Sequence, residues 1–197
     1  MNTQMMTVNV ATAGMLASLI DPLTEPQISR LKIIGVLNGT DIRFLRELIG
    51  SGVHGYATDG NVNYLDLSEV RIVEGGFYYY ASSLSRYFYS RDDEISNNMF
   101  AGCKNLVSIV LPSTLSSIGE SAFWECRNLV EIHCTSKRPP TLTMGWLWSV
   151  GYSSCTVYVP NGTLDAYRAA PLWTCFDNMV EEPVLEIVSL DEIEEVN

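Results

Sequence analysis

The sequence FAGCKNLVSIVLPSTLSSIGESA (residues 100–122) is followed directly by FWECRNLVEIHCTSKRPP (residues 123–140), and the two segments align without a gap. The repeat period is therefore 23 residues, which is too short for two packed helices with their loops. Each unit has room for one short strand and one compact return, so the repeat predicts coils of chain that stack on one another. The identical aligned pairs are Phe100 and Phe123, Cys103 and Cys126, Asn105 and Asn128, Leu106 and Leu129, Val107 and Val130, and Ile109 and Ile132.

The strand of the first unit is predicted over residues 108–111, because Pro112 lacks an N–H group and ends a ladder. More degenerate strand cores occur at residues 31–33, 65–68 and 157–160. Together they predict an α/β protein, a short solenoid with a parallel sheet of about five strands. The apolar positions expected to point into the coil are Leu106, Ile109, Leu111, Leu115, Ile118 and Phe123.

The flanking segments predict helical caps, which a solenoid needs because a terminal coil otherwise exposes its apolar face. Helices are expected over residues 11–20 and 163–170, and over residues 41–49 with Thr40 as N-cap.

These elements divide the chain into three parts. Residues 1–60 form an N-terminal helical cap and the first strand, and residues 61–182 form the solenoid and a C-terminal cap, with an aromatic insert at 75–95. Residues 183–197 form an acidic tail that alternates apolar and acidic side chains. The tail is expected to stay solvated or loosely docked, with an edge strand as the alternative.

Charge and hydropathy exclude several classes of protein. The chain has 197 residues, 47% of them hydrophobic, and 23 acids against 12 bases give a net charge of −11. Such a balance repels nucleic acid and anionic lipid surfaces, and no apolar run is long enough to predict a membrane span. No signal peptide is visible at the N-terminus, which leaves open a cytoplasmic protein or one whose export signal has been removed.

The pattern F-x-x-C-x-N-L-x-x-I-x-x-P-x-x-L-x-x-I-G-x-x-A-F from Phe100 to Phe123 resembles the BspA-like leucine-rich repeat family of bacterial surface and secreted proteins. The similarity extends to LIDPLTEPQISRLKIIGVLNGTDIRFLREL (residues 19–48), YLDLSEVRIVEGG (64–76) and YVPNGTLDAYRAAPLWTCFDNMVEE (158–182). The resemblance implies a leucine-rich-repeat solenoid, an extracellular or cell-surface location and a role in adhesion.

No combination of residues predicts catalysis, a metal or a cofactor. The G-x-G-x-x-G match at residues 50–55 follows a helical pattern, whereas a dinucleotide site needs a strand first. His133 and Cys134 are adjacent in a predicted strand, so they point to opposite faces and cannot act together. The acidic run at residues 92–94 lacks the ligand spacing of a calcium loop. The protein is therefore expected not to be an enzyme.

The repeated Cys103 and Cys126 are interpreted as buried free thiols, because coils about 4.8 Å apart place their Cβ atoms farther apart than a disulfide allows. Asn105 and Asn128 are interpreted as turn residues whose amides satisfy backbone groups of adjacent coils.

The sheet face is the preferred binding site. Within each strand, the residue between two inward apolar residues points outward, which predicts a lateral row on a rigid scaffold. That row suits a protein or glycan ligand, possibly host-derived. The predicted face consists of Lys32, Asp66, Val110, His133 and Tyr158, flanked by Ser68, Ser108 and Glu131.

The aromatic insert is the alternative binding site, since tyrosine-rich loops give recognition surfaces contact area at low entropic cost. The competing interpretation is that these rings cover the edge of the solenoid. Trp146 and Trp148 are expected to pack under the final coil, with sugar stacking as the alternative. The residues proposed for this second site are Tyr78, Tyr79, Tyr80, Tyr87 and Tyr89.

The sequence therefore predicts a non-enzymatic binding or adhesion module that recognises a macromolecule through its sheet face. The runner-up hypothesis is a carbohydrate-binding accessory protein that uses the exposed aromatic rings.

Overall fold

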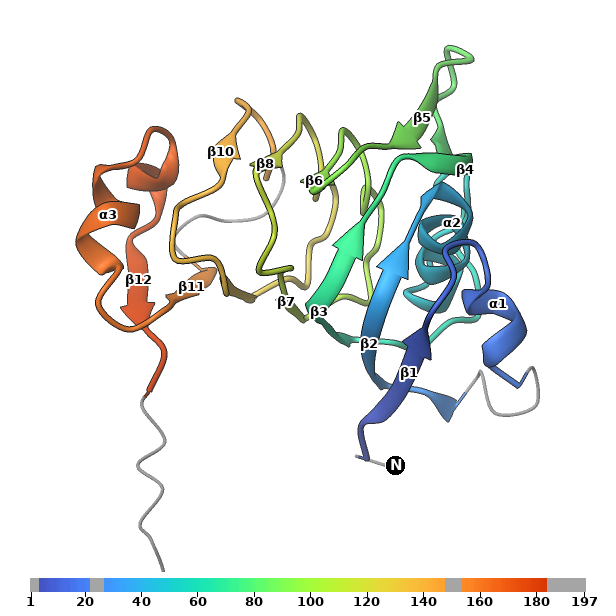
Figure 1. Cartoon of the computed structure of the whole chain (residues 1–197). Helices are drawn as coiled ribbons and strands as arrows, with labels where there is room; N and C mark the ends of the chain where they lie inside the picture. The colour runs from blue at the N-terminus through green and yellow to red at the C-terminus, as the bar shows by residue number, and fades with distance from the viewer. Residues whose placement is uncertain (1–3, 22–26, 148–153, 184–197) are drawn as a thin grey trace, which may run out of the picture.

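The main sheet contains seven parallel strands in the order β1-β2-β3-β7-β9-β11-β12 (Figure 1). The computed structural model describes residues 4–21, 27–147 and 154–183. The strands are β1 (Met6–Val10), β2 (Arg30–Leu37), β3 (Tyr64–Ile72), β7 (Ser108–Val110), β9 (Glu131–His133), β11 (Thr156–Val159) and β12 (Asn178–Glu181).

A second parallel sheet lies across the coils from the main one. It has three strands of two residues each, in the order β10-β8-β6: β6 (Glu94–Ile95), β8 (Ser117–Ile118) and β10 (Thr141–Leu142). Figure 1 shows these strands along the top of the molecule, with β7 and β11 along the bottom. The coil between Ser108 and Leu142 thus alternates between the two sheets, and the side chains between them are shielded from water.

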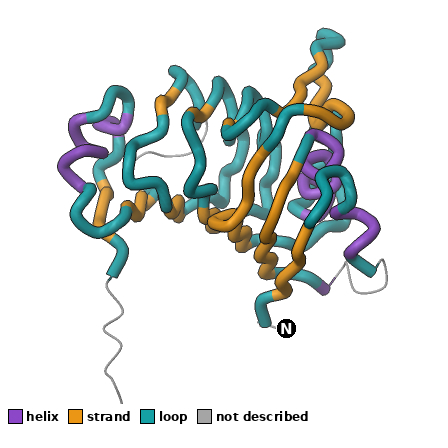
Figure 2. Tube along the Cα trace, in the orientation of Figure 1, coloured by secondary structure: helices purple, strands orange, loops and turns teal. Residues whose placement is uncertain are grey.

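The helices of the described residues gather at the two ends of the molecule (Figure 2). The N-terminal end carries α1 (Leu16–Leu19) and α2 (Gly39–Leu48), and the C-terminal end carries α3 (Leu164–Ala169) and the 3₁₀ helix η2 (Trp173–Cys175). The expected helix over residues 11–20 is wrong for most of its length, because only residues 16–19 are helical.

The N-cap of α2 is Asn38, and the prediction of Thr40 is wrong. The Asn38 side chain accepts from Thr40 N at 2.9 Å, and the Asp41 carboxylate accepts from Asn38 N at 2.9 Å, which together form a capping box. Buried Asp41 also accepts from Leu16 N at 2.9 Å, so it joins α1 to α2. Thr40 is used instead to fix a neighbouring strand, since its Oγ accepts from Phe77 N at 3.0 Å.

The aromatic insert forms an antiparallel hairpin of β4 (Gly75–Ala81) and β5 (Tyr87–Ser90). The hairpin packs against α2 so closely that a Cβ at Gly39 would meet the Phe77 carbonyl oxygen at 2.1 Å. Only glycine fits this first helical residue.

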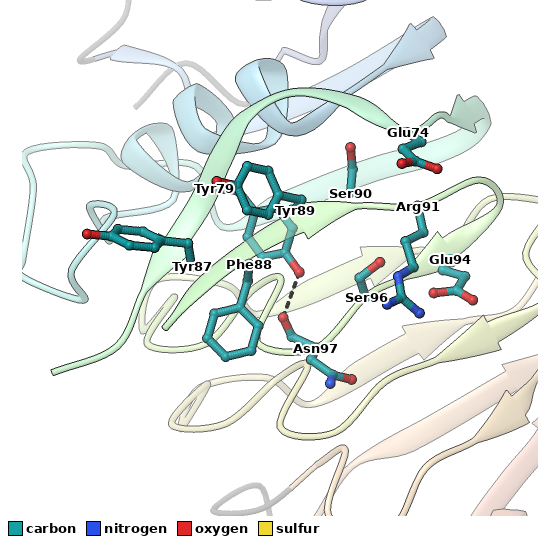
Figure 3. Close-up of a pocket in the computed structure, with 10 residues that line it drawn as sticks. All are labelled: Glu74, Tyr79, Tyr87, Phe88, Tyr89, Ser90, Arg91, Glu94, Ser96 and Asn97. Atoms are coloured by element: carbon teal, nitrogen blue, oxygen red, sulfur yellow. Dashed lines mark hydrogen bonds between the residues drawn. The ribbon is translucent and has the colours of Figure 1, made fainter. Parts of the chain in front are cut away.

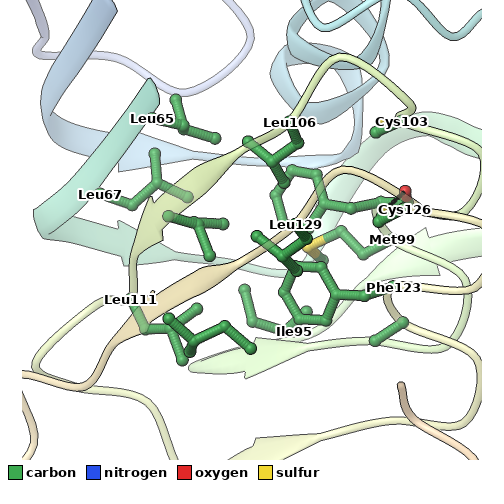
Figure 4. Close-up of a cluster of buried hydrophobic side chains, with 14 of the residues drawn as sticks. Leu65, Leu67, Ile95, Met99, Cys103, Leu106, Leu111, Phe123, Cys126 and Leu129 are labelled. Carbon is green, nitrogen blue, oxygen red and sulfur yellow. Dashed lines mark hydrogen bonds between the residues drawn. The ribbon is translucent and has the colours of Figure 1, made fainter. Parts of the chain in front are cut away.

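The two clean repeats stack as predicted. The rings of Phe100 and Phe123 are nearly parallel at 5.5 Å between centroids, and Trp146 continues the series at 6.0 Å from Phe123. Figure 4 shows the apolar side chains of successive coils meeting in one cluster. The asparagine prediction is confirmed, because the Asn105 amide donates to Gly60 O and the Asn128 amide to Lys104 O, each at 2.7 Å.

The sequence predicted about five strands, and the main sheet contains two more, β1 and β12. β1 and β12 occupy the outer edges of the sheet and do not carry the repeat pattern. Trp146 is buried as expected, whereas Trp148 and the acidic tail from residue 184 lie outside the described residues.

Arg46 on α2 is fully buried and joins the helix to the first coil. Its guanidinium donates five hydrogen bonds, with the shortest reaching Ala101 O at 2.8 Å and Met99 O at 2.9 Å. The guanidinium also lies 4.9 Å from the centre of the Tyr80 ring. Among the described residues no carboxylate pairs with it, so oriented backbone carbonyls stabilise the charge.

Replacing Arg46 with alanine should lower the free energy of unfolding by about 3 kcal/mol or more, because several buried carbonyls lose their donor. Arg43→Ala on the same helix is the control and should cost under about 1 kcal/mol, since the one contact of its guanidinium among the described residues is with the Tyr78 ring at 5.5 Å. Urea denaturation of both variants measures the difference, and equal losses would contradict the role given to Arg46.

Ile109→Ala should cost about 2–5 kcal/mol, because this side chain is fully buried between coils. Val107→Ala lies two residues away on an exposed position and should stay within about 0.5 kcal/mol of the parent. The free energies come from the same denaturation measurement. A loss well below about 2 kcal/mol for Ile109→Ala would contradict the tight packing described for the repeat core.

Candidate functional site

The predicted outward row is in register across the main sheet. Lys32 pairs with Asp66, Asp66 with Val110, Val110 with His133, and His133 with Tyr158. The predicted flanking residues Ser68, Ser108 and Glu131 each lie two residues from a member of the row. The side chains of the five row residues are all half-buried. The strands therefore hold these five side chains in one line across the face.

The C-terminal half of the row contains a stacked pair of rings. His133 and Tyr158 lie 4.4 Å apart between centroids and only 5° from parallel. Two carboxylates flank the imidazole: Glu182 contacts Nδ1, and the Glu131 oxygen lies 3.8 Å from Nε2. This part of the face is aromatic and acidic.

The N-terminal half is a network of paired charges. Lys32 Nζ lies 2.6 Å from a Glu69 oxygen and 3.7 Å from an Asp66 oxygen. The hydrogen bond to Glu69 is the main cause that raises the pKa of Lys32 above its ordinary value, so the amine stays charged at neutral pH. Arg30 lies 4.0 Å from the centre of the Tyr64 ring and forms a cation–π contact.

The structure corrects the expected exposure of this face. Ser108 is buried, with 4% of its surface exposed, and its hydroxyl has no hydrogen-bond partner in the described part of the chain, so it does not flank an accessible row. Ser68 is half-buried, and its backbone N donates to the Asp66 carboxylate at 2.9 Å. The side chains of Asp66 and His133 are only 14% and 19% exposed because their neighbours cover them.

Sequence reasoning missed four members of this face: Arg30, Tyr64, Glu69 and Glu182. A signal for the first two was present, since Arg30 precedes Lys32 by two residues and Tyr64 precedes Asp66 by two, which is the strand period. Glu182 had no such signal. It lies just beyond β12 and reaches His133 across the neighbouring strand.

The alternative aromatic site divides into exposed and buried rings. Tyr87 and Tyr89 are more than half exposed and gather around Tyr78, with centroids at 4.8 and 6.3 Å. Tyr79 and Tyr80 are buried, which agrees with the competing interpretation that rings of the insert serve as a cover. The Tyr79 hydroxyl donates to Asn97 O at 2.6 Å, and burial raises the pKa of this phenol.

The cysteines are free, and four of the five are buried. Burial raises the pKa of Cys103 to about 11 and of Cys134 and Cys155 to about 12, and it raises that of Cys126 well above its ordinary value. Thiolate is the reactive form of cysteine, so these four thiols are inert at neutral pH. Cys126 instead donates to Phe100 O at 3.1 Å, which adds one more link between coils.

Within residues 4–21, 27–147 and 154–183, no group of three or more His, Cys, Asp and Glu side chains is placed to hold a metal ion. In the same ranges no helix is long and apolar enough to cross a membrane.

One known family model matches the part of the chain that contains the two repeats. Residues 64–140 match the family model described as "BspA type Leucine rich repeat region (6 copies)", which confirms the resemblance drawn from the sequence. No curated protein matches the chain. Repeat regions of this type are typically non-enzymatic binding scaffolds, and the proteins that carry them are generally associated with bacterial surfaces.

In the native protein only Cys175 should react quickly with a thiol reagent at pH 7, because it is the exposed cysteine, and denaturation without reductant should reveal all five thiols. Counting labelled cysteines by mass spectrometry checks both numbers. The Cys175→Ser variant is the control and should show almost no fast labelling. Rapid labelling of Cys103 or Cys126 would contradict the burial described above.

Proposed function

We propose, from the premise that residues 64–140 are a BspA-type leucine-rich repeat region, that this protein is a non-enzymatic binding module that recognises a macromolecule through its sheet face. The binding residues are the half-buried members of that face. They are Lys32, Asp66, Val110, Glu131, His133 and Tyr158, with Ser68 at the margin.

The architecture in this proposal is a short leucine-rich-repeat solenoid closed by two caps. Residues 1–60 supply the N-terminal cap and first strand, residues 61–182 the solenoid with its aromatic insert and C-terminal cap, and residues 183–197 an acidic tail. The position of the helices at the two ends of the sheet supports this division.

One observation carries the proposed site: the side chains from five neighbouring strands stand in register on a hydrogen-bonded sheet. Rigid placement lowers the entropic cost of binding, because fewer side chains must be ordered when a partner arrives. The stacked pair of His133 and Tyr158 presents a flat aromatic surface. Aromatic residues are enriched at the centre of protein interfaces.

The charge of the face favours a partner with basic groups at the C-terminal half. Glu131 and Glu182 flank the rings there, whereas Lys32 is already paired with Glu69 and Asp66. Complementary charge raises association rates and excludes acidic partners.

The proposed setting is the outside of a bacterial cell, where the module serves adhesion to a host or bacterial macromolecule. The general surface association of BspA-type repeat proteins supports this location. A carbohydrate-binding role for the exposed tyrosines is the second candidate, and the cluster of Tyr78, Tyr87 and Tyr89 on the hairpin favours it.

The test is a triple substitution of Asp66, His133 and Tyr158 to alanine, applied to arrays of immobilised extracellular-matrix proteins and of glycans. The parent protein should bind one or more array proteins saturably, and the triple variant should bind at least about thirtyfold more weakly, the scale of an interface hot spot. The variant should lose only about 1 kcal/mol of stability per site, because the removed contacts are partly exposed hydrogen bonds and ring contacts.

Tyr87→Ala combined with Tyr89→Ala is the matched control, since both rings are exposed and lie on the hairpin. It should leave protein binding unchanged. Loss of binding in the hairpin variant, with normal binding in the triple variant, would move the site to the aromatic insert.

A further inference from the structure

A pocket of about 360 Å³ lies between the β4–β5 hairpin and the segment that leads into the first regular coil. It is open to solvent on one side, and more of its exposed lining is polar than apolar. Its volume is near the lower end of the about 300–1,000 Å³ typical of small-ligand sites. In Figure 1 the hairpin stands at the opposite side of the molecule from β7 and β11, so the pocket is separate from the sheet-face row.

Aromatic rings form one side of the pocket. Tyr79 is fixed by its hydroxyl bond to Asn97 O, and Phe88 is half-buried against Tyr80 at 5.8 Å between centroids. Figure 3 shows the Tyr79 and Phe88 rings on the side of the pocket away from the charged residues. Tyr79 is fully buried, so of these two rings Phe88 is the one with surface that a ligand can reach. The Phe88 ring is held in place before any ligand arrives, and it offers a rigid apolar surface.

Unpaired charges of both signs form the other side. The side chains of Arg91, Glu74 and Glu94 line the pocket, and in the described part of the chain none of them makes a hydrogen bond or an ion pair. Figure 3 shows the Arg91 and Glu94 side chains directed toward the same region, next to Ser96. A guanidinium offers only donors and a carboxylate only acceptors, so a ligand at this position needs groups that both accept and donate.

The lining of the pocket also contains a buried hydroxyl group. Ser96 is 6% exposed, and its hydroxyl lies beside the Tyr79 hydroxyl and makes no other polar contact among the described residues. Buried hydroxyl groups are nearly always hydrogen-bonded in folded proteins. Other polar groups nearby are already used, since Ser90 donates to Val73 O at 2.8 Å and Asn97 accepts from Glu120 N at 2.8 Å.

We propose that this pocket binds one neutral sugar unit, with the apolar face of the pyranose ring on Phe88 and its hydroxyl groups on Arg91, Glu94 and Glu74. Sugar hydroxyls both donate and accept, which matches the mixed charges of the lining. Two carboxylates against one guanidinium disfavour an acidic sugar, and the guanidinium disfavours a cation. The site does not depend on the sheet face being a binding surface.

The experiment is saturation-transfer NMR of the whole protein with glucose, galactose, mannose, N-acetylglucosamine and N-acetylgalactosamine. At least one of them should give a saturable signal with a Kd on the order of 1 mM, as expected for a ligand of this size. Arg91→Met and Glu94→Gln should each weaken binding by about tenfold or more, while thermal unfolding stays close to that of the parent.

Arg86→Met is the matched control, because Arg86 is an exposed arginine of the same hairpin and does not line the pocket. It should bind as the parent does, and so should the Asp66, His133 and Tyr158 triple variant. The proposal is overturned if none of the five sugars binds or if Arg91→Met and Arg86→Met bind equally. It is also overturned if N-acetylneuraminic acid or choline binds and the neutral sugars do not.

Discussion

No coil of this protein can bury its own apolar side chains, so each depends on the coil beside it. The stacking of Phe100, Phe123 and Trp146 satisfies this constraint through the centre of the chain, and Trp146 then meets Trp173 and Phe176 from the C-terminal end. Polar groups follow the same rule. The asparagine amides and the Cys126 thiol all donate to carbonyls of a preceding coil, which keeps the backbone of each turn hydrogen-bonded where no strand continues.

At the N-terminal end a charged group links neighbouring segments, as the stacked aromatic rings do between the later coils. The Arg46 guanidinium reaches carbonyl oxygens at Gly52, Met99 and Ala101, so one side chain connects α2, the loop that follows it and the first coil. Asp41 joins α1 to the same helix. The helical end and the repeats are therefore joined by specific hydrogen bonds in addition to packing, and this fixes the position of the hairpin that lies on α2.

The 23-residue period was enough to predict the stacked coils and the burial of the repeated thiols. The outward row was predicted from strand alternation within the repeats and within the more degenerate strand cores outside them. The edge strands β1 and β12 could not be predicted, since they lie outside the two clean repeats and carry no repeat signal. The true N-cap of α2 was missed because Asn38 and Thr40 are both good capping residues. The choice depends on Asp41, whose carboxylate serves Asn38 and Leu16 together. The sequence left open whether the insert's rings are exposed or act as a cover, and it did not show which of them are buried. The burial of Tyr79 and Tyr80 comes from packing against α2, Arg46 and Asn97.

The dependence of each coil on its neighbours also affects how the protein opens. In a linear array, stability is approximately a sum of unit and nearest-neighbour contributions, so local opening starts where a unit has a neighbour on one side only. Among the described strands β12 pairs with β11 alone, and Glu182, which follows it, supplies a contact to His133. Fraying of this edge would free the imidazole from one of its two carboxylates. The electrostatic character of the sheet face is therefore coupled to the local stability of the C-terminal edge of the sheet, although Glu182 lies 49 residues from His133 in the sequence.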